Sequence, residues 1–67
     1  MATLVQHAVS VPVGVVKSFG RLGPQYEVLS YAGHSSEGKD LVKIRVIRSG
    51  ELTEYEYDSM MADPEAI

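Results

Sequence analysis

The chain contains no cysteine among its 67 residues. It can therefore form neither a disulfide nor a thiolate-ligated zinc site, and this composition is typical of a reducing cytoplasm. The two histidines, His7 and His34, lie far apart and show no metal-ligand spacing, so we expect no metal and no cofactor. A core of this size rarely supplies more than about 3–5 kcal/mol. The fold must therefore depend on tight packing of its apolar residues or on oligomerisation.

Long apolar runs are also missing from the sequence. No stretch approaches the roughly 18 apolar residues of a membrane-spanning helix. The N-terminus lacks the basic region that precedes the apolar core of a secretory signal. We therefore expect a cytoplasmic protein with no membrane partner.

Positive charge is scarce and unevenly placed. The net charge is −3, whereas nucleic-acid-binding domains carry an excess of lysine and arginine. All six basic residues lie between Lys17 and Arg48, and six acidic residues with no base follow Arg48. The acidic C-terminal block could form a partner site, or a hairpin could fold it against the basic block and neutralise both.

Residues Leu41–Asp58 form the most readable segment, with two β-type runs around Ser49-Gly50. The predicted hairpin register gives one apolar face and one face of opposite charges. Its pairs include Arg48–Glu51, Arg45–Glu54, Ile44–Tyr55, Lys43–Glu56 and Val42–Tyr57. The turn type stays open between a two-residue turn, a glycine bulge and a four-residue loop.

Two further strands are predicted, at Val13–Phe19 and Tyr26–Tyr31. The segment between them is rich in glycine and proline, which is typical of a turn. The polar segment Ala32–Asp40 is predicted to be a loop. Asp58 or Ser59 could cap a short C-terminal helical turn, with Met60 and Met61 as its apolar side chains, and Pro64 discourages helix at Asp63.

The N-terminal part of the chain has the weakest pattern. Met1–Ser10 is predicted to be a flexible segment, followed by one small β domain over residues 11–67. Valines alternate with other residues over Val9–Val15, and Pro12 restricts such a segment to a sheet edge or a lead-in. An apolar edge of this kind could mediate a weak homodimer; otherwise the protein is a monomer.

These elements predict a mainly β fold. We expect a single small antiparallel sheet of three or four strands in sequential order. The sheet is curled or closed into a small SH3-like barrel, with a short C-terminal helical turn. An α+β domain is the alternative.

The residues also resemble a known family. Three segments carry the resemblance: Phe19-Gly-x-x-Gly-Pro-x-Tyr-Glu-Val28, the predicted strand Val-Lys-Ile-Arg-Val, and Asp63-Pro-Glu-Ala near the C-terminus. They are similar to a group of short bacterial proteins classified as a domain of unknown function, over roughly Val11–Ala66. The resemblance implies a bacterial, cytosolic protein and brings no activity or catalytic residue with it.

One loop contains two patterns that resemble catalytic or nucleotide-binding motifs. Gly33 to Lys39 has the spacing of a phosphate-binding loop, but a strand rather than a helix is predicted to follow it. His34, Ser35, Ser36 and Asp40 are the residue types of a hydrolytic triad, without a pocket or oxyanion donors to support them. We interpret this segment as a polar strand connection and expect no enzyme activity.

Two functions remain open. The first is a non-enzymatic accessory module that binds a protein partner through an edge strand or through its acidic C-terminal surface. The second is a small nucleic-acid-associated barrel or regulator, which the acidic net charge disfavours. In such a protein, basic side chains contact the phosphates of the nucleic acid and aromatic side chains stack on its bases. The predicted binding residues are Lys17, Arg21, Tyr31 and Lys39, with Phe19 as an alternative to Tyr31 for stacking.

Overall fold

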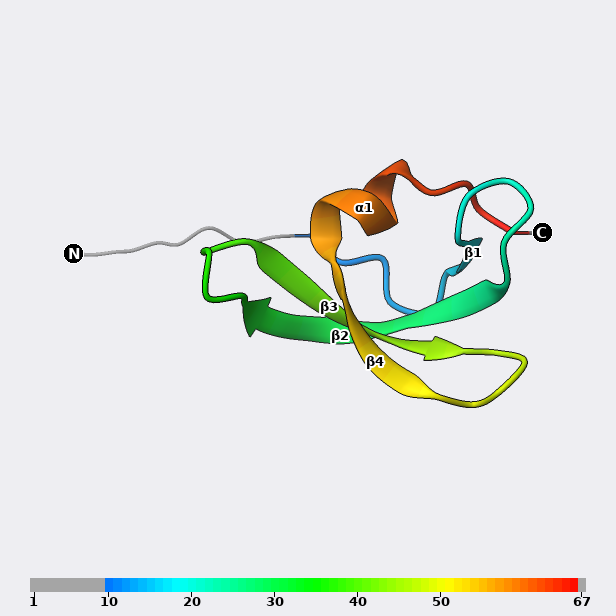
Figure 1. Ribbon diagram of the computed structural model, residues 1–67, viewed down its shortest axis with the longest axis horizontal. Coiled ribbons are helices and arrows are strands. Elements are labelled where there is room, and N and C mark those ends of the chain that lie inside the picture. The colour runs from blue at the N-terminus through cyan, green and yellow to red at the C-terminus, as the bar shows by residue number, and fades with distance from the viewer. Residues whose placement is uncertain (1–9, 67) are drawn as a thin grey trace.

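The computed structural model describes residues 10–66. It contains four strands and one helix: β1 (Val16–Ser18), β2 (Gln25–His34), β3 (Asp40–Val46), β4 (Leu52–Glu56) and α1 (Tyr57–Ala62). The strands form one open sheet in the order β1-β2-β3-β4, each antiparallel to the next (Figure 1). The mainly β prediction and the sequential strand order are confirmed.

The first two strands differ in length from their predictions. Only Val16–Ser18 of the predicted first strand is β1, because the preceding residues turn, with the N–H of Val15 donating to the carbonyl of Pro12 at 3.2 Å. Strand β2 extends to His34. The predicted loop at Ala32–Asp40 is consequently a tight turn, in which the N–H of Ser35 donates to the carbonyl of Lys39 at 2.8 Å.

Strand β2 contains two irregularities in its pairing with β3. The register shifts between Val28 and Ser30 and again between Tyr31 and Gly33. Each shift inserts one extra residue, which moves the following side chains to the other face of the sheet. The bulges explain why the sequence of β2 does not alternate cleanly between apolar and polar positions.

The register of the β3–β4 hairpin differs by two residues from the prediction. The observed pairs are Leu41–Glu56, Val42–Tyr55, Lys43–Glu54, Ile44–Thr53 and Arg45–Leu52. The four-residue loop 47–50 decides this register: the N–H of Val46 donates to the carbonyl of Glu51 at 2.8 Å, and that of Gly50 donates to the carbonyl of Val46 at 2.7 Å. Gly50 takes a φ of 75°, which favours glycine at this position.

The charged pairs predicted for the hairpin change with the register. Arg45 lies opposite Leu52 and instead pairs with Glu27 of β2, with Nη2 and Oε1 at 2.6 Å. Lys43 lies opposite Glu54, and Glu56 lies opposite Leu41. The predicted pairs Arg45–Glu54 and Lys43–Glu56 are therefore wrong. The faces of the strands are nevertheless as predicted, because side chains alternate with a period of two.

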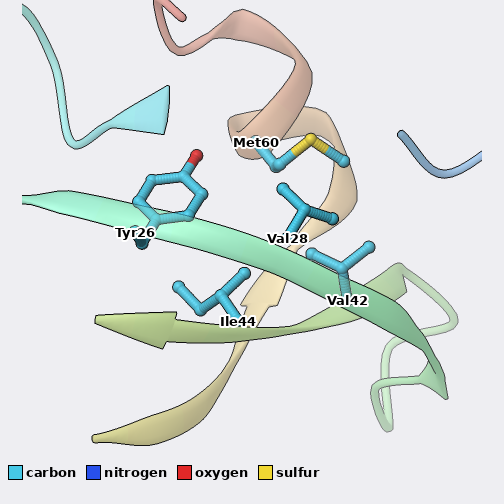
Figure 2. Close-up of a cluster of buried hydrophobic side chains, with 5 residues drawn as sticks. All are labelled: Tyr26, Val28, Val42, Ile44 and Met60. Atoms are coloured by element: carbon cyan, nitrogen blue, oxygen red, sulfur yellow. The ribbon is translucent and has the colours of Figure 1, made fainter. Parts of the chain in front are cut away.

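Helix α1 covers one face of the sheet. Its Met60 is fully buried against the core, as Figure 2 shows. The other core side chains come from β2 and β3: Tyr26, Val28, Val42 and Ile44. The helix begins earlier than predicted, with Glu56 as N-cap and no side-chain cap bond. It ends before Asp63, whose extended backbone is favoured by the following Pro64.

The predicted flexible segment Met1–Ser10 lies outside the described residues, apart from Ser10. The carbonyl of Ser10 accepts a hydrogen bond from the Tyr57 hydroxyl at 3.0 Å, and Val11 packs against the core. None of the helices within residues 10–66 is long and apolar enough to span a membrane.

Candidate interaction surface

The predicted binding residue Lys17 lies inside the fold, with 5% of its surface exposed. Its ammonium donates to the carbonyl oxygen of Met60 at 2.5 Å and to that of Met61 at 3.4 Å. These carbonyls belong to the last turn of α1, where a cation is favoured by the helix dipole. Lys17 therefore links β1 to the end of α1.

The other three predicted binding residues are divided between the β1–β2 loop and the β2–β3 end of the sheet. These two connections lie at opposite ends of the sheet (Figure 1). Arg21 is exposed in the loop between β1 and β2, whereas Lys39 is exposed in the turn at the opposite end of β2. Tyr31 is 42% exposed toward the Lys39 end, and its hydroxyl donates to Oδ1 of Asp40 at 2.7 Å. The structure thus separates the predicted set and does not form a continuous basic surface from it.

The turn after β2 contains the residues that resembled a hydrolytic triad. Nε2 of His34 lies 3.3 Å from Oδ1 of Asp40. Oγ of Ser35 instead accepts hydrogen bonds from the backbone N–H groups of Glu37 and Lys39, each at 3.2 Å. That serine stabilises the turn, and the strand β3 follows Lys39 directly. The geometry agrees with a polar strand connection.

The carboxylate of Asp63 joins the C-terminal segment to the sheet. Its Oδ2 accepts hydrogen bonds from the hydroxyls of Tyr26 at 2.8 Å and Tyr55 at 2.9 Å, and its Oδ1 accepts one from the N–H of Gly20 at 3.4 Å. The rings of Phe19, Tyr26 and Tyr55 pack against one another, with centroid distances of 4.5–5.5 Å between the three pairs. No pattern in the sequence predicted this cluster. An aspartate before a proline was its only local signal.

Stability is expected to fall at alkaline pH through this cluster. Burial, followed by the hydrogen bond and charge of Asp63, raises the pKa of Tyr55 from 10.0 to about 12 and raises the pKa of Tyr26 further. Because both folded pKa values are raised, the stabilisation is complete below pH 10 and falls as the pH rises from 10, up to about pH 12 for Tyr55 and beyond it for Tyr26. Urea unfolding across this range should show the loss. It should be much smaller in a Tyr26→Phe/Tyr55→Phe variant, and an equal loss in that variant would contradict the assignment.

The two edges of the sheet differ in the described part of the chain. The C-terminal segment covers the outer edge of β1: the N–H of Ser18 donates to the carbonyl of Pro64 at 3.1 Å, and that of Ala66 donates to the carbonyl of Val16 at 2.8 Å. Lys17 and Glu65 form an antiparallel bridge there. Across residues 10–66, the other edge strand, β4, pairs with β3 alone.

The open edge of β4 presents alternate backbone groups. The carbonyl of Glu51 accepts from Val46 and so points toward β3. Because N–H and C=O groups alternate in direction along a strand, those of Thr53 and Tyr55 also face β3. The N–H and C=O groups of Leu52 and Glu54, and the N–H of Glu56, therefore face outward from the sheet. The carbonyl of Glu56 instead begins α1, because Glu56 is the N-cap of that helix.

Exposed apolar side chains lie next to this edge. Leu52 on β4 is 58% exposed, and Ile47 in the β3–β4 loop is 42% exposed. Ile47 also lines a pocket of about 420 Å³ between this loop and the β1–β2 loop. The remaining lining residues are Leu22, Gly23, Pro24, Gln25 and Arg48. This end of the sheet therefore combines unpaired strand backbone with accessible apolar surface.

Over residues 10–66, the protein is a small open antiparallel sheet with one face covered by a short helix and one strand edge exposed. The chain belongs to a family of unknown function, DUF5397, whose model matches residues 3–67. An uncharacterized protein of Haemophilus influenzae is 38% identical over 56 residues, which is 84% of this chain and 89% of that protein. The predicted relationship to an uncharacterised family with bacterial members is confirmed.

Proposed function

We propose that this protein is a non-enzymatic, cytoplasmic interaction module that binds a partner protein by strand addition to β4. The observation that carries the proposal is the contrast between the two sheet edges. The edge of β1 is occupied by residues 64–66, whereas the outward backbone groups of β4 lie open within the described part of the chain. An added strand supplies hydrogen-bond partners for these groups, and adjacent side chains supply specificity.

The composition of β4 supports this role. Soluble proteins commonly protect an edge strand with charged side chains, especially lysine, with proline or with a bulge. Strand β4 reads Leu-Thr-Glu-Tyr-Glu, and its pairing with β3 is continuous. Its exposed Leu52 also offers an apolar contact beside the open backbone. With neither proline nor a bulge, β4 leaves its outward backbone groups able to pair with an added strand, and its two glutamates restrict by charge which strand can approach.

Replacing Glu54 with proline tests the proposal. Proline removes an outward-facing N–H and leaves the groups that face β3 in place, and proline is tolerated on an edge strand in this orientation. We expect partner affinity to fall at least about tenfold, since one hydrogen bond is lost and the ring obstructs strand approach. Proteins captured from a bacterial lysate by the wild type are identified, and their affinities for each variant are then measured.

The matched control is Glu54→Gln, which keeps the N–H. The Glu54→Gln variant should still bind those partners whose added strand pairs with β4 mainly through backbone hydrogen bonds. Hydrogen exchange gives a second measurement: the amides of Leu52, Glu54 and Glu56 should become protected in the complex. Equal partner affinity of the Glu54→Pro variant, without protection of these amides, would refute strand addition at β4.

A further inference from the structure

The outer face of the sheet, opposite α1, has rows of cross-strand neighbours that end at β4. Each row crosses from β2 through β3 to β4. The three rows are Glu27–Arg45–Leu52, Ser30–Lys43–Glu54 and Gly33–Leu41–Glu56. A strand added to β4 contributes one side chain to each row. The residues at the β4 end of these rows therefore determine which side chains the partner must carry.

Negative charge exceeds positive charge at this boundary. Arg45 is paired with Glu27 at 2.6 Å. Lys43 is the base in the row of Glu54, and the row of Glu56 contains no base. Neither Glu54 nor Glu56 has an ion-pair partner within 4.0 Å among residues 10–66. Asp58, in the first turn of α1, adds a further exposed carboxylate after β4.

A second copy of the chain fits this edge poorly. Antiparallel pairing of two β4 strands along their whole length is centred on Glu54, so the two Glu54 side chains would lie directly opposite each other. Leu52 would lie opposite Glu56 in the same pairing. Like charges directly opposite are destabilising in a sheet, so the charges favour a different and basic strand.

We infer that β4 binds an antiparallel partner strand with lysine or arginine at two alternate positions, facing Glu56 and Glu54, and an apolar residue two positions later, facing Leu52. This inference depends on the proposed strand addition. The antiparallel direction continues the pairing of every neighbouring strand in the sheet. Each matched cross-strand charge pair contributes roughly 0.2–1 kcal/mol.

A short peptide titration tests the inference on the full chain. The probe is a threonine peptide with two lysines at alternate positions, followed two positions later by a leucine. One control has glutamates in place of the lysines, and another has the same composition with the lysines adjacent. Two charge pairs predict a roughly two- to thirty-fold preference for the alternating lysine probe over the glutamate probe. Amide chemical shifts should change at Leu52–Glu56.

Charge exchange gives the matched protein control. In a Glu54→Lys/Glu56→Lys variant, the preference should reverse toward the glutamate peptide. The lysine preference of the wild type should also weaken as salt rises. Equal binding of both alternating peptides to the wild type, or an unchanged preference in the variant, would overturn the inference.

The Glu54→Pro variant separates this inference from the proposed function. If it loses peptide binding while the wild type shows no charge preference, strand addition stands and the basic partner is wrong. If it binds every peptide as the wild type does, strand addition at β4 itself fails. Self-association of the wild type that Glu54→Pro abolishes, measured by sedimentation, would identify a second copy as occupant and would also overturn the inference.

Discussion

Replacing Asp63 with alanine is expected to lower the free energy of unfolding by about 2–4 kcal/mol. The substitution removes the carboxylate that accepts three hydrogen bonds. The hydroxyls of Tyr26 and Tyr55 donate to its Oδ2 at 2.8 and 2.9 Å, and the N–H of Gly20 donates to its Oδ1. An unsatisfied buried donor costs about 1–3 kcal/mol, and hydrogen bonds to a charged group are the stronger ones. A domain of this size has only about 3–5 kcal/mol of stability from its core. The variant should therefore be largely unfolded in mild urea.

Two variants isolate the hydrogen bonds of Asp63 from a general loss of packing. Asp63→Asn keeps a side-chain oxygen for the tyrosines, so it should cost clearly less than alanine. In a Tyr26→Phe/Tyr55→Phe background, Asp63→Ala should be nearly neutral, because both tyrosine donors and their acceptor are then removed together. The remaining donor, the Gly20 N–H, is exposed and can bind water instead. Urea unfolding of the wild type, Asp63→Ala, Tyr26→Phe/Tyr55→Phe and the triple variant gives the coupling energy directly. An undiminished cost in the phenylalanine background would exclude these hydrogen bonds as its cause.

Replacing Gly23 with alanine is expected to destabilise the protein by about 3 kcal/mol or more. A Cβ at this position would overlap the carbonyl oxygen of Phe19 and lie 2.8 Å from its carbonyl carbon. Overpacking typically costs about 1–3 kcal/mol, and here the obstructing atoms belong to the backbone and cannot change rotamer. Relief of the overlap would displace Phe19, whose ring packs 4.5 Å from that of Tyr26. Thermal unfolding and near-ultraviolet circular dichroism report both effects.

The matched control for this prediction is Gly20→Ala in the same loop. Gly20 has a φ of 70°, yet a Cβ there would meet no atom within 4 Å. Its cost should be only the left-handed backbone strain of about 1–2 kcal/mol. If the Gly23→Ala variant is as stable as Gly20→Ala, the loop can move to accommodate the added Cβ, and the predicted cost of the overlap with Phe19 is wrong.

Local pattern determined the architecture of this protein. Alternation placed Val42 and Ile44 on one face with Thr53 and Tyr55, and the structure confirms that face. Pro64 predicted the end of the C-terminal helix, because the residue before a proline disfavours helical backbone. Short strands joined by glycine-rich turns predicted a sequential antiparallel sheet. Each of these features depends on neighbouring residues alone.

The tertiary structure alone decided the hairpin register, the role of Lys17 and the open edge. A pattern with period two cannot distinguish registers that differ by two residues, so the loop closed by Gly50 selected among them. From the sequence, Lys17 is predicted to be an exposed binding residue, as most lysines are exposed. It is buried because the end of α1 returns to β1 and places the Met60 carbonyl against its ammonium. The same return covers the edge of β1, whereas β4 has no further strand partner within residues 10–66. Which segments meet depends on the path of the whole chain.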